Sequence, residues 1–160
     1  MMSYKRGGKE LTPDDMNTIK RFADAGGSLF LLCPVWVWTS YDHKPQEINP
    51  YYKIGKLFRL SLVDEYPKGA LRLTQNAIFP GPQIEAPEKW GTFSRVISAN
   101  PTTISLIDDE ANNSFGVAAI SEKSKIVLIG HNFLAWPDVY KEPGPLSSYT
   151  IRLLDWLLQD

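Results

Sequence analysis

The chain has 160 residues, with 17 lysines and arginines against 18 aspartates and glutamates, which gives a formal net charge of −1. A chain of this length can bury its own core, so we predict a single domain over residues 1–160, with residues 1–10 as a flexible tail. The balanced charge excludes the basic field that attracts nucleic acid, and no apolar run is long enough to predict membrane insertion.

Residues that could carry chemistry are few. Cys33 is the only cysteine, and the two histidines, His43 and His131, are far apart, so the chain has neither a disulfide framework nor zinc-type spacing. The sequence therefore predicts no cofactor and no metal. The first residues contain no apolar segment of a secretory signal, which predicts a cytoplasmic protein, with a secreted parent as the alternative.

The first predicted element is a helix that begins at Pro13 and ends at the pair Gly26-Gly27. Thr12 precedes it as the N-cap, and two acidic residues occupy the first turn, where the helix dipole favours them. Glycine suits the left-handed residue that ends many helices. The apolar residues predict one buried stripe, made of Met16, Ile19, Phe22 and Ala23.

An apolar run without alternation follows, Leu29 to Cys33, typical of a strand covered on both faces of a sheet. The loop behind it, residues 34–46, is long and aromatic. Ligands of open α/β sheets bind beyond the carboxyl ends of the strands, so this loop is a candidate ligand site. Trp36 and Trp38 stand at alternate positions, and in an extended segment both point to one side. Such a pair suits stacking on a sugar or gripping a partner, with core packing as the alternative.

Two polar clusters have simple interpretations. Asp42 and His43 could act as an acid–base pair, but adjacent loop residues point apart easily, so a solvated turn is the preferred interpretation. Asp108, Asp109 and Glu110 are interpreted as a polar turn between strands, because the ligand spacing of a calcium loop is missing.

The rest of the chain is predicted as a helix, short strands and a closing helix. Asn49 and Pro50 start the helix as cap and first residue, with buried positions at Tyr51, Ile54, Leu57 and Phe58. Strands are expected at 60–63, 70–74, 95–98, 102–107, 115–120 and 125–130, the last two joined as a hairpin. Ser147 or Ser148 caps the final helix, whose expected apolar face is Ile151, Leu154, Trp156, Leu157 and Leu158.

These motifs support a resemblance to a known family. The run LTPDDMNTIKRFADAGGSLFLL resembles the helix, Gly-Gly and strand unit of class I glutamine amidotransferase-like domains, and KIVLIGHNFL with YTIRLLDWLL is similar to their late strand and closing helix. The order GGSLFLL, W-x-W and an Asn-led helix is most similar to the non-catalytic domains of this type beside mucin-directed metallopeptidases and in TRP-channel-associated factors.

The resemblance implies an α/β fold with a three-layer, flavodoxin-like sheet. The sheet would be mostly parallel, with an antiparallel C-terminal hairpin. The strand–helix–strand unit that usually comes first in such domains would be missing, because the chain begins too late to contain it. One edge of the sheet would then be open, or would be covered by a partner or by a missing segment.

The resemblance also places Cys33 where catalytic members carry their nucleophile, and His131 where they carry its base. Pro34 disfavours a nucleophile here, because proline offers no N–H to an oxyanion and holds the preceding residue in extended geometry. The family's His-Pro-Glu is replaced by His131-Asn132-Phe133. Cys33 is therefore interpreted as a small buried hydrophobe, and no catalytic residue is favoured.

Three functions follow as hypotheses. The leading one is a non-catalytic binding or interaction module, a pseudoenzyme whose partner is a glycan or a protein. Its predicted ligand-binding residues are Trp36, Trp38, Tyr41, Asp42, His43, His131 and Trp136. The alternative is a thiol hydrolase or amide-transfer enzyme that uses Cys33 and His131. The third is a structural subunit that docks, or forms a homo-oligomer, through the open sheet edge.

Overall fold

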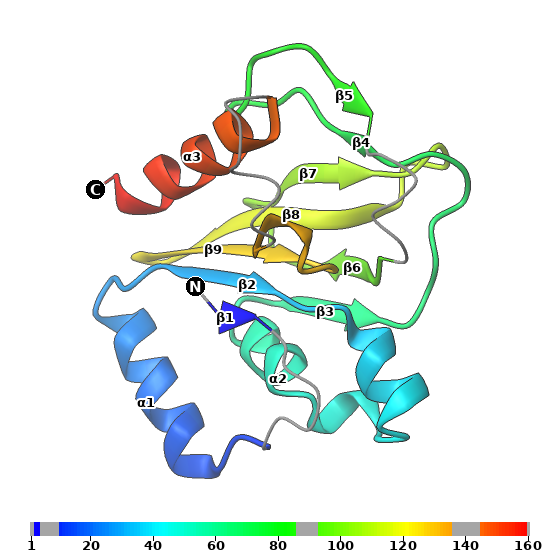
Figure 1. Ribbon diagram of the computed structural model, residues 1–160. Helices are drawn as coiled ribbons and strands as arrows, with labels where there is room; N and C mark the ends of the chain where they lie inside the picture. The colour runs from blue at the N-terminus through cyan, green and yellow to red at the C-terminus, as the bar shows by residue number, and fades with distance from the viewer. Residues whose placement is uncertain (1, 4–9, 86–92, 136–144, 160) are drawn as a thin grey trace.

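The computed structural model describes residues 2–3, 10–85, 93–135 and 145–159. In this part of the chain the helices are α1 (Pro13–Asp24), α2 (Pro50–Leu57) and α3 (Pro145–Leu158), with short helical turns at Val37–Tyr41, Gln46–Ile48 and Phe133–Ala135. The large sheet has the strand order β1 (Met2–Ser3), β2 (Leu29–Leu32), β9 (Ser124–Ile129), β8 (Ser114–Ser121), β7 (Ile104–Asp108), β4 (Arg72–Leu73) and β5 (Ile84–Glu85). A second sheet pairs β3 (Leu60–Val63) with β6 (Arg95–Ser98). The fold is therefore mixed α/β (Figure 1).

The strand directions differ from those predicted. β2 pairs in parallel with β9 and with β1, but the pairs from β9 through β8, β7 and β4 to β5 are all antiparallel. The predicted parallel majority is therefore wrong, while the predicted C-terminal hairpin is confirmed as β8 and β9. Chain connectivity explains part of the difference, because the five residues between β7 and β8 are too few for the crossover that parallel neighbours need.

The edge of the large sheet beside β2 is partly covered by the chain itself. Met2 and Ser3 belong to the segment predicted as a flexible tail, but they form β1 opposite Leu31 and Leu32 of β2. The predicted open edge is thus occupied along two residues of β2. β1, α1 and β2 form a strand–helix–strand unit. Its two strands are parallel, and parallel neighbours need a long crossover connection, which here contains α1.

Apolar side chains along β2 alternate between two cores, one on each face of the sheet. Phe30 and Leu32 belong to one cluster, whereas Leu31 and Cys33 belong to the other. α1, α2 and the small sheet of β3 and β6 cover the cluster of Leu31, and α3 covers the cluster of Phe30 (Figure 1). Both faces of β2 are therefore covered, as predicted, which explains why the segment from Leu29 to Cys33 is apolar without alternation.

α1 begins and ends as the sequence predicts. Thr12 is its N-cap and forms a capping box with Asp15, in which each side chain accepts a hydrogen bond from the other residue's N–H. Gly26 has a left-handed φ of 93°, and the N–H groups of Gly26 and Gly27 bond back into the last turn as in a Schellman motif. Phe22 was expected in the buried stripe, but it is 51% exposed and lies across Gly27.

α2 begins at a buried cap. Asn49 is fully buried, and its Oδ1 accepts hydrogen bonds from the N–H groups of Tyr51 at 2.8 Å and Tyr52 at 3.2 Å. Gly55 stands inside the helix because α2 lies close to β3 there, where a Cβ would come within 3.2 Å of the Leu60 carbonyl oxygen. Three of the predicted buried positions are confirmed: Tyr51, Ile54 and Phe58.

α3 starts earlier than predicted and buries a different face. It begins at Pro145, where proline is favoured in the first turn, and not after Ser147 or Ser148. Its buried apolar residues are Tyr149, Leu153 and Leu157. Trp156 is half-buried, and the remaining residues of the predicted face are exposed: Ile151, Leu154 and Leu158. The last two turns are apolar on nearly every side, so periodicity alone could not select the face that meets the sheet.

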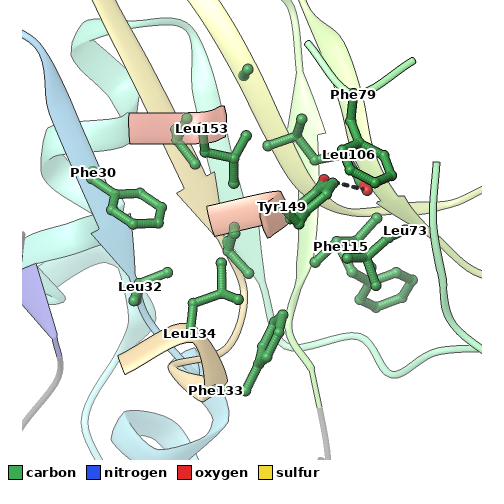
Figure 2. Packing of buried hydrophobic residues seen from close by; sticks show 14 of the residues in the cluster. Phe30, Leu32, Leu73, Phe79, Leu106, Phe115, Phe133, Leu134, Tyr149 and Leu153 are labelled. Atoms are coloured by element: carbon green, nitrogen blue, oxygen red, sulfur yellow. Dashed lines mark hydrogen bonds between the residues drawn. The ribbon is translucent and has the colours of Figure 1, made fainter. Parts of the chain in front are cut away.

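Tyr149 fixes which face of α3 meets the sheet (Figure 2). Its ring packs edge-on against Phe79, with 5.0 Å between the ring centroids. Its hydroxyl donates to the carbonyl of Leu106 on β7 at 2.9 Å. A buried hydroxyl needs such a partner, so this bond sets the rotation of the helix about its axis.

The acidic run between β7 and β8 forms a polar turn, as predicted. Asp109 is fully buried, and its carboxylate accepts from the N–H groups of Lys68, Ala111 and Asn113 and from the Asn113 side chain. Burial by itself raises the pKa of Asp109, but these hydrogen bonds outweigh it and hold the pKa below its ordinary value. The carboxylate is thus used in holding the turn.

Candidate functional site

Cys33 lies at the carboxyl end of β2, where the resemblance places a nucleophile. The residue is fully buried, and its N–H donates to the Ile129 carbonyl at 2.9 Å. Its Sγ lies 3.8 Å from Nδ2 and 3.9 Å from Oδ1 of Asn49, the cap of α2. Burial raises the pKa of the Cys33 thiol far above its ordinary value, and the Asn49 contact offsets only part of that rise. The thiol is therefore protonated and closed to solvent.

His131 follows β9 and is also buried. It is 4% exposed, and its ring stacks on Phe93 with 4.6 Å between the centroids. Its Nδ1 accepts a hydrogen bond from the Phe133 N–H at 3.0 Å. Burial lowers the pKa of His131 to about 4, so the imidazole is neutral near pH 7.

Cys33 and the ring neighbours of His131 belong to different cores. Cys33 lies in the cluster beneath α1 and α2, whereas the ring neighbours of His131, Phe93 and Phe133, lie in the cluster beneath α3. A thiol nucleophile needs its base within hydrogen-bond reach. The side chain that meets the Cys33 thiol is Asn49, which cannot act as a base.

The backbone after Cys33 also differs from a nucleophile elbow. Pro34 has no N–H, and Cys33 is not among the described residues with positive φ. The next two N–H groups, those of Val35 and Trp36, donate to a single acceptor, the Ser94 Oγ, at 2.9 and 3.4 Å. The donors nearest to an oxyanion position are thus bonded to a hydroxyl of the chain itself.

Ser94 reaches this position because the chain crosses close to the end of β9. Its N–H donates to the Gly130 carbonyl at 2.8 Å, and a Cβ at position 130 would lie 1.7 Å from the Ser94 carbonyl oxygen. Only glycine leaves room for this crossing. The preceding residue, Phe93, stacks on His131. Residues 93–94 therefore occupy the space beyond the ends of β2 and β9, where the ligand crevice was predicted.

The two tryptophans of the aromatic loop do not form a paired surface. The backbone is helical at Trp36, with φ −58° and ψ −28°, and continues into the π-helical turn Val37–Tyr41. Alternate residues of a helix point in different directions, so the predicted common side is wrong. Trp38 is fully buried, and its Nε1–H donates to the Pro45 carbonyl at 3.0 Å. Trp36 is half-buried.

Three of the other predicted ligand residues, Tyr41, Asp42 and His43, lie on or directly after the same turn, whereas His131 is buried after β9. Tyr41 closes the π-helical turn, Asp42 is half-buried, and His43 is exposed with a left-handed φ of 49°. Trp136 lies outside the described residues. The structure thus brings Trp36, Asp42 and His43 to one surface turn, and it places Trp38 in the interior.

The described residues form neither a metal-binding cluster nor a helix that could span a membrane. Among residues 2–3, 10–85, 93–135 and 145–159, no three histidine, cysteine or acidic side chains come together in a way that could hold a metal ion. In the same ranges, no helix combines the length and the apolar composition needed to cross a bilayer.

No model of a protein family matches the chain, and no curated protein matches it. The amidotransferase-like resemblance therefore rests on the sequence motifs.

Sequence reasoning missed the long-range contacts of three residues that shape this region, Asn49, Ser94 and Gly130. Asn49 is recognisable as a helix cap, but its contact with Cys33 joins positions 16 residues apart. Ser94 has no sequence feature that predicts its bonds to the turn after β2. Gly130 offers a usable signal, because a glycine that directly follows a buried strand often marks the close approach of another backbone.

Proposed function

We propose that the chain is a non-catalytic interaction domain, a pseudoenzyme of the glutamine amidotransferase-like type. The observation that carries this proposal is the burial of Cys33 against Asn49, in a different core from the ring neighbours of His131. A thiol nucleophile must be deprotonated, accessible to substrate and close to a base. Cys33 meets none of these three conditions.

The proposed fold type is a three-layer, flavodoxin-like arrangement with an enlarged antiparallel part. Helices on both faces of the large sheet support it, with α1 and α2 on one face and α3 on the other (Figure 1). The parallel strands β1, β2 and β9 support it as well. In such sheets the functional loops follow the carboxyl ends of the parallel strands, which is where the turn after β2 lies.

The proposed contact surface is the rim formed by Trp36, Asp42 and His43. The turn that carries it is held firmly, because Trp38 is anchored in the interior and the Thr39 hydroxyl donates to Asp64 beyond β3 at 2.6 Å. Binding residues on a rigid support lose little conformational entropy when a partner binds. A tryptophan beside a carboxylate and an imidazole suits a sugar ring or a polar protein surface.

The first test is the reactivity of Cys33. We expect the native thiol to resist iodoacetamide from about pH 6 to about pH 9, and to react at the rate of an ordinary cysteine once the chain is unfolded. The measurement is the alkylated fraction by mass spectrometry as a function of pH. The expected protection follows from burial of the thiol and from its raised pKa.

A variant of His131 is the control for this test. His131→Phe keeps an aromatic ring against Phe93 and removes any base, and we expect it to leave the pH profile of Cys33 alkylation unchanged. A native thiolate that titrates below about 8.5 and is lost in His131→Phe would contradict the proposal. That result would support the Cys–His enzyme instead.

The second test concerns the rim. We expect a panel of soluble oligosaccharides to include one that quenches the tryptophan fluorescence of the chain, with at least a tenfold loss of affinity in Trp36→Phe. Trp156→Phe is the matched control, because Trp156 is also half-buried but lies on α3. Equal binding by both variants, or no quenching by any member of the panel, would contradict a glycan-binding rim.

A further inference from the structure

A groove lies where the end of α1, the β8–β9 hairpin and the end of α3 meet, at the left of Figure 1. Its volume is about 500 Å³, within the range of small-molecule sites. It lies beside the start of β2, whereas the rim of the proposed function follows the other end of that strand. The groove is therefore separate from the rim.

Two helices contribute apolar side chains to the groove. Phe22 of α1 is 51% exposed, and its ring lies across Gly27, where an added Cβ would come within 2.3 Å of it. Leu158 of α3 is 81% exposed, and the buried Leu157 lines the groove beside it. An alkyl chain laid against these side chains removes apolar surface from water on both partners, which favours binding.

The charged residues among those that line the groove are both lysines, Lys123 and Lys125. The Lys125 Nζ donates to the carbonyl oxygens of Trp156 at 3.0 Å and Gln159 at 2.5 Å, which holds the ammonium group at the end of α3. These bonds use two of its three N–H donors. The carbonyl end of α3 offsets part of the Lys125 charge, and the exposed Lys123 adds a second positive charge.

Acidic residues of the surrounding segments line other pockets. Asp24 of α1 and Glu122 of the hairpin line a smaller pocket together with Lys20, and Asp24 is paired with Lys20 at 2.6 Å. Asp155 of α3 lines a third pocket, beside Ile78. The described residues that line the groove therefore combine apolar side chains with positive charge, which complements an anion with an apolar tail.

We propose that this groove binds a medium-chain fatty carboxylate. The alkyl chain lies against Phe22 and Leu158, and the carboxylate accepts from Lys123 and from the third N–H of Lys125. Hydrogen bonds between ammonium groups and carboxylates are charge-assisted and therefore strong. The same lysines repel a cationic amphiphile, and an anion without a tail leaves the apolar side chains uncovered. This site does not depend on the proposed function, so either can fail alone.

An NMR titration of the backbone amides tests the site and the ligand class. The ligands added are decanoate, butyrate, which keeps the head group on a short tail, and decyltrimethylammonium, which keeps the tail and reverses the charge. We expect decanoate to bind with a dissociation constant on the order of 100 µM, at least about tenfold tighter than either of the other two. The amides that shift should be those of residues 25–28, 123–125 and 157–159. Shifts that gather elsewhere, no binding of decanoate, or equal affinity for decyltrimethylammonium overturns the proposal.

Variants of exposed residues test the two parts of the ligand separately. Lys123→Glu should weaken decanoate binding at least about tenfold, and Lys123→Arg, which keeps the charge, should bind like the parent chain. Lys68→Glu makes the same charge change at an exposed residue before β4 and is the matched control. Leu158→Ser should weaken binding at least about fivefold, whereas Ile97→Ser, at a residue of β6 that is 44% exposed, should not.

Two outcomes with these variants overturn the proposal. The first is a decanoate affinity that Lys123→Glu or Leu158→Ser leaves equal to that of its control. The second is a loss of decanoate binding in Trp36→Phe, because that residue belongs to the rim and not to the groove. Retained decanoate binding in Trp36→Phe supports the groove whether or not the rim binds a glycan.

Discussion

Gly130→Ala is expected to destabilise the protein by at least about 3 kcal/mol. The added Cβ would lie 1.7 Å from the carbonyl oxygen of Ser94 and 2.7 Å from its carbonyl carbon, whereas non-bonded carbon atoms pack at about 3.5 Å or more. The obstacle is backbone, which cannot rotate away as a side chain can. Relief requires residues 93–94 to leave the end of β9, which breaks the Ser94 hydrogen bonds and the stack of Phe93 on His131.

Gly116→Ala is the matched control for this prediction. Gly116 lies on the neighbouring strand β8, and its added Cβ would meet only side-chain atoms, those of Ile107 at 3.2 Å and Ile129 at 3.3 Å. These side chains can shift, so we expect a change within about 1 kcal/mol. Denaturant unfolding followed by circular dichroism gives both values. A loss in Gly130→Ala no larger than that in Gly116→Ala would show that the crossing of residues 93–94 is not rigid.

Asn49→Ala is expected to cost about 3 kcal/mol of stability. Removing the amide leaves the buried N–H groups of Tyr51 and Tyr52 without their acceptor and removes the contact of the Cys33 thiol. Water cannot replace the lost acceptor easily, because Asn49 is fully buried. If Cys33 reacts through unfolding of this region, its alkylation rate in native buffer should rise about a hundredfold in the variant.

Thr12→Ala at the start of α1 is the control for Asn49→Ala. Both positions are N-caps followed by proline, but Thr12 is exposed, so water can satisfy the released donors. We expect a loss of about 1 kcal/mol and no large change in Cys33 alkylation. Equal losses at the two caps would mean that Asn49 acts as an ordinary surface cap and does not seal the thiol.

The elements that local chemistry defines were predictable. Thr12 and Asn49 each precede a proline, and both cap helices where the sequence places them. The Gly26-Gly27 pair ends α1, and the short Ser-Glu-Lys-Ser segment joins β8 to β9 as a hairpin. In these cases the deciding hydrogen bonds join residues within a few positions of each other, so a short window of sequence contains the whole signal.

The candidate site was less predictable, because its geometry depends on distant residues. Trp36 and Trp38 were assigned a shared face on the assumption of an extended loop, but Ser94 accepts the first N–H groups of this segment, which is helical. Pro34 was informative, since it correctly indicated that Cys33 lacks elbow geometry. The separation of Cys33 from His131 depends on which face of the sheet each side chain enters, and residue types alone do not decide that.

The sequence by itself determined where the helices start, which run forms the central strand and why Cys33 makes a poor nucleophile, because these properties follow from residue type and near neighbours. Only the tertiary structure decided the antiparallel majority of the sheet, the buried face of α3 and the filling of the crevice by Phe93 and Ser94. These features depend on contacts between residues far apart in the chain, such as the Tyr149 hydroxyl with Leu106 and the Ser94 backbone with Gly130. Apolar residues on several sides of one helix are compatible with more than one packing, and long-range hydrogen bonds and close backbone contacts select among them.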